Sequence, residues 1–247
     1  MGKRQRLDKI LVERGLVASR EEGQGRILAG EVWVNDRPVT KAGTLLEESV
    51  AIRVRSRLPY VSRGGIKLEK ALREFTVEVA GKVVLDVGAS TGGFTDCLLT
   101  HGAKQVYAVD VGYGQLDWKL RNDPRVLVLE KTNIRYLHVS NLPIPADLAT
   151  IDVSFISLRL VLPRVKTLLS SGAPIIALIK PQFEVGKGKV GKGGVVRAQE
   201  EHTRVIDEIS NAAVGLGYHV GGVIESPLLG PAGNKEFFIQ LQDGADL

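Results

Sequence analysis

The sequence predicts an open α/β fold with a mainly parallel sheet, preceded by a small, separate α+β domain. From about residue 83 onward, short apolar runs typical of buried strands alternate with amphipathic helical stretches. The last two predicted strands follow one another without a helix, so we expect one antiparallel strand. All of the excess positive charge lies in residues 1–63, which hold 13 Lys and Arg against 8 Asp and Glu, whereas the remainder holds 20 of each. This shift in composition indicates a basic module in front of a neutral domain.

The basic module is predicted to contain two helices and two strands. Apolar residues at helical spacing predict a first helix over 7–12, and Ser19 with Glu22 makes a capping box that opens a second. Alternating apolar and polar residues then predict strands over 32–34 and 50–54. A basic face of this kind favours nucleic-acid phosphates as partners. We assign seven side chains to it: Arg4, Arg6, Lys9, Arg14, Arg20, Arg26 and Arg37.

The segment RLDKILVERGLVASREEGQGRILAGEVWVNDRPV closely resembles a known RNA-binding domain. That domain was first seen in a protein of the small ribosomal subunit and is shared by some tRNA synthetases and pseudouridine synthases. The resemblance covers about residues 5–55 and implies RNA as the partner. We therefore expect an RNA-binding domain over 1–57, a linker over 58–63 and a second domain over 64–247.

The second domain is predicted to begin with an amphipathic stretch over 66–75 and a buried strand over 83–87, which a glycine turn joins to a helix ending near residue 101. We expect the further strands over 105–109, 126–129, 147–152, 174–180, 218–225 and 235–241, and the further helices over 158–169 and 201–216. A parallel sheet binds its ligand at the carboxyl ends of its strands. Candidate functional residues are therefore sought at those ends.

The glycine turn DVGASTGGF, together with Asp110, predicts a nucleoside-binding site. Asp110 ends the second strand 24 residues beyond Asp86, close to the distance at which such folds place a carboxylate on a ribose hydroxyl. The pattern G-x-x-x-G-G differs from the dinucleotide fingerprint, and Asp86 would repel a pyrophosphate, so NAD fits poorly. S-adenosylmethionine has no phosphate and carries an ammonium and a sulfonium, so we expect this cofactor. The residues predicted to bind it are Asp86, Gly88, Ala89, Ser90, Thr91, Gly92, Gly93, Phe94 and Asp110.

Four charged residues are expected near the same edge of the sheet. Asp152 and Lys180 end two strands, Glu236 begins the last one, and Lys67 lies in the first amphipathic stretch. This set resembles the Lys-Asp-Lys-Glu tetrad of FtsJ-like ribose 2′-O-methyltransferases. SRGGIKLEKAL, DVGASTGGFTD, IDVSFISL, IKPQFE and KGGVVR are similar to segments of the TlyA family of ribosomal RNA 2′-O-methyltransferases, historically called hemolysin A. The resemblance spans essentially the whole chain.

The resemblance implies a Rossmann-like class I methyltransferase sheet and methyl transfer from S-adenosylmethionine to the 2′-hydroxyl of a cytidine in ribosomal RNA. A sugar hydroxyl needs a base to take its proton while the methyl carbon is held in line with the sulfur, and no metal is required. A lysine of ordinary pKa, about 10.4, is protonated at neutral pH, but desolvation beside a second ammonium lowers such a pKa. We assign Lys180 as the base, with Lys67 and Asp152 positioning the hydroxyl and the amine, and Glu236 supporting them.

Two other functions are weighed against this assignment. A membrane-lysing protein is suggested only by the older family name, and the longest apolar stretch, around 174–179, is far short of the ~20 residues that span a bilayer. The second alternative is a non-catalytic, RNA-binding ribosome assembly factor, which only a methyl-transfer assay would distinguish from the enzyme. The N-terminus lacks the apolar core of a signal peptide and Cys97 is the only cysteine, so we expect a cytoplasmic protein without a multi-cysteine metal site.

Overall fold

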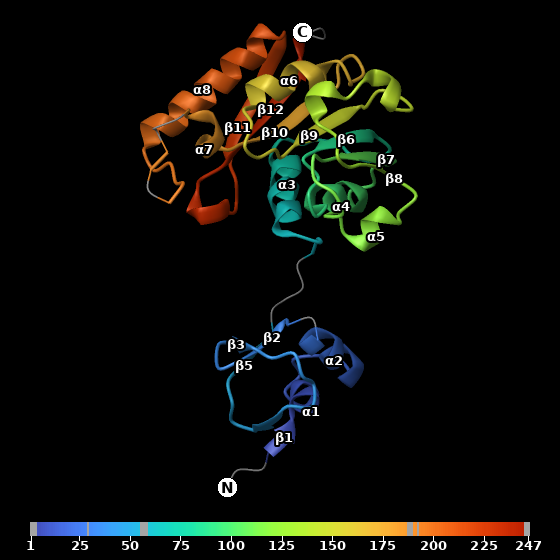
Figure 1. Cartoon of the computed structure of the whole chain (residues 1–247), viewed down its shortest axis with the longest axis vertical. Helices are drawn as coiled ribbons and strands as arrows, with labels where there is room; N and C mark the ends of the chain where they lie inside the picture. Colours follow the sequence, from blue (N-terminus) through green and yellow to red (C-terminus); the bar gives the residue numbers. More distant parts are fainter. Residues whose placement is uncertain (1–3, 29, 55–58, 187–189, 192, 245–247) are drawn as a thin grey trace. The chain divides into compact units, whose positions relative to one another are not determined.

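The computed structural model forms two compact units, Met1–Leu58 and Pro59–Leu247 (Figure 1). It describes residues 4–28, 30–54, 59–186, 190–191 and 193–244. Tyr60 is buried in the second unit, and the backbone N–H of Val61 donates to Asp96 Oδ2 at 2.8 Å. These residues therefore pack on the second unit, while the division into 1–57, 58–63 and 64–247 stays a prediction.

The first unit combines two short helices with two small antiparallel sheets around one core. The helices are α1 (Leu7–Glu13) and α2 (Arg20–Leu28). One sheet pairs β1 (Arg4–Arg6) with β4 (Leu45–Glu47), and the other has the order β3 (Arg37–Pro38), β2 (Val32–Val34), β5 (Ile52–Val54). The core that they share consists of Leu7, Leu11, Val17, Ile27, Val32 and Val34.

The Ser19 half of the capping box predicted before α2 is present, whereas the Glu22 side chain reaches back to Ala18, one residue before Ser19. Ser19 Oγ accepts from the backbone N–H of Glu22 at 3.1 Å, and Glu22 Oε2 accepts from the N–H of Ala18 at 2.9 Å. The bond to Ser19 satisfies an N–H group that a helix start otherwise leaves without an acceptor. The strands β1, β3 and β4 were not predicted, because their residues, RQR, RP and LLE, show no alternation of apolar and polar side chains.

The second unit is built on a seven-stranded sheet with the order β11-β12-β10-β9-β6-β7-β8. The strands are β6 (Val83–Val87), β7 (Gln105–Val109), β8 (Val126–Leu129), β9 (Leu148–Ile151), β10 (Ile175–Ile179), β11 (Tyr218–Glu225) and β12 (Phe237–Asp243). Among the described residues, β12 is antiparallel to both of its neighbours, and the other strand pairs are parallel. The predicted parallel sheet with one antiparallel strand is confirmed.

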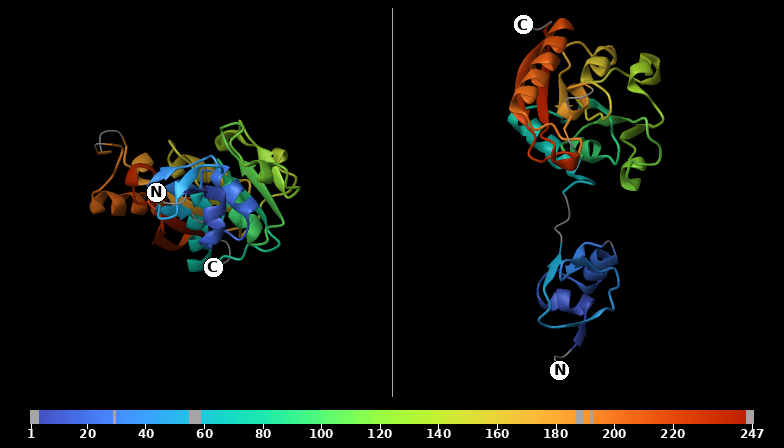
Figure 2. Two further views of the ribbon diagram at one scale, coloured as in Figure 1. Left: turned by 90° about the horizontal axis from the view of Figure 1, so that it is seen from below. Right: turned by 60° about the vertical axis from the view of Figure 1, so that its left-hand side comes forward.

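Helices cover both faces of this sheet (Figures 1 and 2). They are α3 (Arg63–Glu74), α4 (Gly93–Thr100), α5 (Trp118–Arg121), α6 (Leu158–Lys166), α7 (Pro181–Glu184) and α8 (Gln199–Gly215), with short 3₁₀ turns η1 (Ile134–Tyr136), η2 (Val139–Asn141) and η3 (Pro231–Gly233). One apolar core joins the sheet to α6 and α8 through residues such as Val161 and Val205. The other joins it to α3 and α4 through Leu68 and Cys97.

The strand order reverses beside β6, which lies between β9 and β7, and open α/β sheets bind ligands at such a switch point. The turn after β6 depends on a glycine there. Gly88 has φ +87°, and a Cβ built on it would lie 2.4 Å from the carbonyl oxygen of Asp152. Only glycine therefore allows the carboxyl end of β6 to lie this close to the carboxyl end of β9.

Candidate functional site

Two cavities lie beside the glycine turn at the carboxyl edge of the sheet. The larger has a volume of about 550 Å³ and reaches from the turn to Asp110 at the end of β7. The smaller has a volume of about 300 Å³ and contains all four residues of the predicted tetrad. Gly88, Ser90 and Asp152 line both cavities. A ligand in one cavity is therefore adjacent to a ligand in the other.

Asp110 holds the glycine turn against the end of β7. Its Oδ2 accepts from the backbone N–H of Ser90 at 2.8 Å, and its Oδ1 accepts from that of Gly112 at 2.7 Å. Each carboxylate oxygen has two lone pairs, so Asp110 can accept further hydrogen bonds from a ligand in the larger cavity.

Asp86 does not line either cavity, which differs from its predicted contact with the cofactor. Its carboxylate is completely buried and accepts from Thr95 Oγ1 at 2.6 Å and from Thr150 Oγ1 at 3.0 Å. Successive side chains of a strand point to opposite faces, and it is the neighbouring Val87 that reaches the cavity. Burial raises the pKa of Asp86 to about 7. The carboxyl group thus connects β6 to α4 and β9.

The other residues predicted to bind the cofactor divide between the two cavities. Gly88, Ser90 and Asp110 line the larger cavity; Gly88, Ala89, Ser90, Thr91, Gly93 and Phe94 line the smaller one. Gly92 lines neither and is packed against α5, because a Cβ on it would lie 2.2 Å from Leu120. This geometry does not support contact of the whole turn with one ligand.

Further residues of the larger cavity were not singled out from the sequence. They follow β7, β8 and β9 in irregular segments and in η1, where no periodicity marks a residue as facing a cavity. They are Val111, Gln115, Thr132, Asn133, Ile134, Arg135, Val153, Ser154, Phe155 and Ile156.

The tetrad forms two ion pairs within the smaller cavity. Lys67 Nζ lies 2.6 Å from Glu236 Oε2, and Lys180 Nζ lies 2.6 Å from Asp152 Oδ1. Lys180 Nζ also donates to Ser154 Oγ at 3.0 Å. The structure thus brings the four predicted residues together and puts Asp152 beside Lys180, whose amine it was expected to position, although the sequence did not indicate that Lys67 pairs with Glu236.

Because the tetrad is buried, the two partners of each ion pair depend on each other. Lys67 and Lys180 are each 9% exposed and Glu236 is 1% exposed, so each ammonium needs its carboxylate to offset the loss of hydration. Glu236 Oε1 is buried and has no hydrogen-bond partner among the described residues. A hydroxyl group of a bound substrate would satisfy that oxygen.

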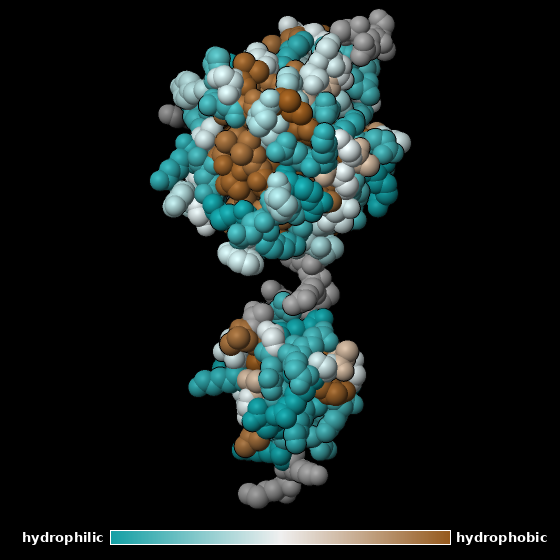
Figure 3. All heavy atoms as spheres, turned by 90° about the vertical axis from the view of Figure 1, so that its right-hand side faces the viewer, coloured by the Kyte–Doolittle hydropathy of each residue, from teal (hydrophilic) through white to brown (hydrophobic). Residues whose placement is uncertain are grey.

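The structure divides the seven predicted RNA-binding residues of the first unit into two groups. Arg4, Lys9 and Arg37 are exposed, and their side chains have no hydrogen bond or ion pair with the part of the chain that is described. The other four are bound within their own unit: Arg6 and Arg20 to Asp8, Arg14 to the carbonyl oxygens of Glu48 and Val50, and Arg26 to Glu22. The face of this unit seen in Figure 3 is largely hydrophilic.

Asp8 organises two of those arginines. It is fully buried, and the Arg6 guanidinium holds the pKa of its carboxyl well below the ordinary value. Its Oδ2 lies 2.9 Å from both Arg6 Nη2 and Arg20 Nε. The side chains of Arg6 and Arg20 remain 42% and 45% exposed, so both keep N–H groups that can reach a phosphate.

Comparison with known proteins identifies both units. A model of FtsJ-like methyltransferases matches residues 60–243, and a model of the S4 domain matches residues 5–52. The 16S/23S rRNA (cytidine-2′-O)-methyltransferase TlyA of Mycobacterium tuberculosis is 48% identical over 100% of this chain and 92% of its own length. The chain belongs to the TlyA family of FtsJ-like methyltransferases. This confirms the family predicted from the tetrad and the glycine turn.

Two further relatives support the same membership. Hemolysin A of Brachyspira hyodysenteriae is 42% identical over 94% of this chain and 97% of its own length. A solved structure of a protein from Streptococcus thermophilus is 41% identical, covers 99% of this chain and 90% of that chain, and superimposes with a TM-score of 0.76. Within the described residues, no helix is long and apolar enough to cross a membrane.

Proposed function

We propose that this protein transfers the methyl group of S-adenosylmethionine to the ribose 2′-hydroxyl of a cytidine in ribosomal RNA. The observation that carries the proposal is the shared wall of the two cavities, with the paired tetrad in the smaller one. The activity named for the relative from Mycobacterium tuberculosis, a cytidine-2′-O-methyltransferase, requires two adjacent sites of this kind.

The larger cavity fits S-adenosylmethionine. Its volume lies within the range of roughly 300–1,000 Å³ that is typical of cofactor sites. Asp110 would accept hydrogen bonds from the ribose hydroxyls of the cofactor, and the backbone around Gly88 and Ser90 would lie against its methionine part. When bound, the cofactor supplies an electrophilic methyl group.

The smaller cavity would receive the target ribose. Lys180 Nζ would first release its own proton to solvent and then, as the amine, take the proton of the 2′-hydroxyl, while Asp152 and Ser154 hold the amine in place. Glu236 Oε1 would accept from a ribose hydroxyl, and Lys67 would fix Glu236 through its ion pair. Because this site is largely buried, hydrogen bonds to the hydroxyl would be stronger than in water.

The S4 domain would hold the RNA through its phosphates. Arg4, Lys9 and Arg37 are among the exposed cations of this unit that lack partners among the described residues, and Arg6 and Arg20 retain exposed N–H groups. Phosphate contacts fix position and orientation without reading the sequence. We infer a ribosomal subunit or its RNA as the partner and the cytoplasm as the place of action.

Methylation of purified rRNA with isotope-labelled S-adenosylmethionine tests the proposal. Lys180→Ala should leave cofactor and RNA binding largely intact and lower the single-turnover rate by at least ~10²-fold, as expected for a lost general base. Lys235→Ala is the matched control, because Lys235 makes only an exposed ion pair with Glu225 near the same edge. A near-native rate for Lys180→Ala would move the base role to Lys67. RNA binding by the native protein without any methyl transfer would instead indicate an assembly factor.

A further inference from the structure

Two short segments leave the strands that carry Asp152 and Lys180. From Asp152 the chain runs through residues 153–157 to the start of α6, whereas α7 begins directly after Lys180. The Lys180–Asp152 ion pair and the Lys180–Ser154 hydrogen bond join the two segments at the cavity. The position of Lys180 Nζ therefore depends on how the segments are held relative to each other.

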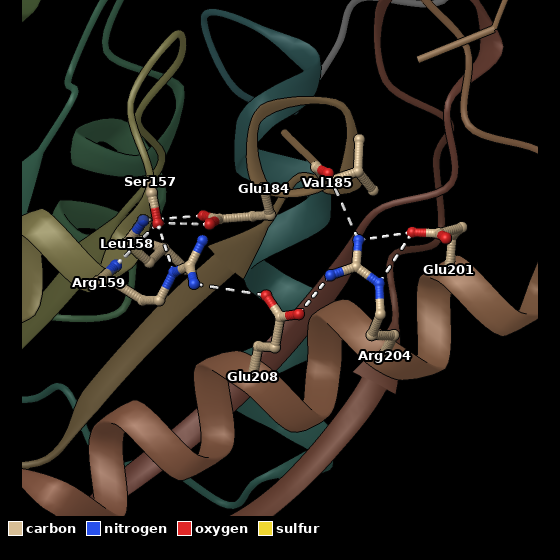
Figure 4. Close-up of polar contacts among 8 residues, drawn as sticks. All are labelled: Ser157, Leu158, Arg159, Glu184, Val185, Glu201, Arg204 and Glu208. Atoms are coloured by element: carbon tan, nitrogen blue, oxygen red, sulfur yellow. Dashed lines mark hydrogen bonds and ion pairs between the residues drawn. The ribbon is translucent and has the colours of Figure 1, made fainter. Parts of the chain in front are cut away.

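Glu184, the last residue of α7, joins the same two segments and lines neither cavity. Its Oε2 accepts from Ser157 Oγ at 2.5 Å, and its Oε1 accepts from the backbone N–H of Leu158 at 2.8 Å (Figure 4). Ser157 is the N-cap of α6 and accepts from the N–H of Arg159 through its Oγ. Glu184 thus binds the start of α6 through both the cap side chain and the first free N–H group.

Glu184 is an unusual choice for this position. Its side chain is buried, with 5% of the residue exposed, and its two bonding partners are neutral groups. Burial raises the pKa of the Glu184 carboxyl above its ordinary value, so keeping a carboxylate here costs free energy. A residue that costs stability and yet makes two well-directed bonds between the segments of the tetrad indicates a role in the site.

We propose that Glu184 is a positioning residue, which fixes Lys180 against Asp152 and the target hydroxyl by holding α7 to the start of α6. The bonds form a closed ring: Lys180 contacts Asp152 and Ser154 at one end, and Glu184 contacts Ser157 and Leu158 at the other. With both ends tied, neither segment can shift without breaking a bond. This inference rests on the proposed role of Lys180 as the base.

Ion pairs behind the ring connect it to α8 (Figure 4). Arg159 Nη1 lies 3.4 Å from Glu208 Oε2, and Arg204 is paired with both Glu208 and Glu201. These side chains are partly exposed, and ion pairs of this kind contribute little to the free energy of folding. Glu201 binds Arg204, which lies on α8 outside the two segments, so Glu201→Ala supplies a matched control.

The test is the single-turnover methylation rate of the full-length protein at saturating RNA and cofactor. Glu184→Ala should lower this rate about tenfold or more, because misplacing a reacting group by around an ångström costs up to about 10²-fold. Glu184→Gln retains an acceptor for the Leu158 N–H and should keep more of the rate. The affinity for S-adenosylmethionine, measured by calorimetry, should stay within about twofold, and Glu201→Ala should behave like the native protein.

A native rate for Glu184→Ala would overturn the inference, as would a loss of cofactor affinity equal to the loss of rate, or an equal effect of Glu201→Ala. If Glu184→Ala does not fold, Ser157→Ala removes one of the two bonds without changing α7 and should still lower the rate severalfold. Lys180→Ala is measured in parallel. A near-native methylation rate for Lys180→Ala would refute the proposed base. A slow Lys180→Ala together with a native methylation rate for Glu184→Ala would refute only the role of Glu184.

Discussion

Adding one methyl group at Gly88 should slow methyl transfer, beyond its effect on the stability of the fold. In Gly88→Ala the new Cβ would lie 2.4 Å from the carbonyl oxygen of Asp152, whereas real Cβ atoms essentially never approach closer than 3.0 Å. The obstacle is backbone, so it cannot rotate away as a side chain would. The end of β9 must therefore move by about 0.6 Å or more, and Asp152 must move with it.

The size of the effect follows from two contributions. Gly88 has φ +87°, and a residue with a Cβ in that conformation costs roughly 1–2 kcal/mol, to which overpacking adds about 1–3 kcal/mol. Displacement of Asp152 also moves the partner of Lys180, whose Nζ lies 2.6 Å from Asp152 Oδ1. We expect the rate of methyl transfer to fall by about tenfold to a hundredfold.

Gly81→Ala provides the control for backbone strain. Gly81 has φ +74°, but nothing lies within 4 Å of a Cβ built on it, and it lines neither cavity. Urea unfolding should show destabilisation of both variants, while single-turnover methylation should be impaired only in Gly88→Ala. Equal rates for the two folded variants would refute the argument that the close approach at Gly88 holds Asp152 in place.

Three further predictions concern the cofactor, the buried acid and the RNA. Asp110→Ala should weaken S-adenosylmethionine binding by roughly 1–3 kcal/mol, and unchanged affinity in calorimetry would contradict that contact. Asp86 has a folded-state pKa of about 7 against 3.8 when unfolded, so the folded state retains a proton that the unfolded chain loses. Stability should therefore fall by up to about 4 kcal/mol as pH rises from about 4 to 7, and urea unfolding of Asp86→Asn should lack this fall. Replacing Arg4, Lys9 and Arg37 by Ala should flatten the slope of log RNA affinity against log salt by about 2, because each lost phosphate contact contributes about 0.7–0.9. A salt titration with an unchanged slope would place the RNA chiefly on the other unit.

The order and type of most elements were predictable, because burial imposes a period on the sequence. The strands from β6 to β10 are apolar runs, and α8 shows an apolar stripe, so both could be recognised without knowing any contact. The positions of Asp152 and Lys180 at strand ends followed from the same runs. Periodicity says nothing of partners, however, and the pairing of Lys67 with Glu236 depends on β12 lying beside β10.

The features of the site that the sequence did not predict depend on the direction in which a side chain points and on its hydrogen bonds to particular neighbours. Asp86 stands in the glycine-turn motif, but its side chain points away from the cavity toward Thr95 and Thr150. Arg6 was assigned to RNA, which stays a prediction, but the sequence did not indicate that Asp8 also binds it within its own unit. Glu184 ends the segment IKPQFE, but nothing in that segment indicated its contacts, because a single acid after a strand is indistinguishable from a surface charge until its neighbours are known.

The placement of β12 makes the order of synthesis matter for this enzyme. It is the last strand of the described chain, yet it lies inside the sheet between β10 and β11, and its approach segment carries Glu236. Lys67 and Glu236 are 169 positions apart, so a growing polypeptide contains the lysine long before its counter-ion exists. A nascent chain without β12 has an open edge on β10 and an uncompensated charge at Lys67. If the tetrad acts as proposed, its site is completed only when this last strand is made, and a product truncated before residue 236 would carry an S4 domain but lack Glu236.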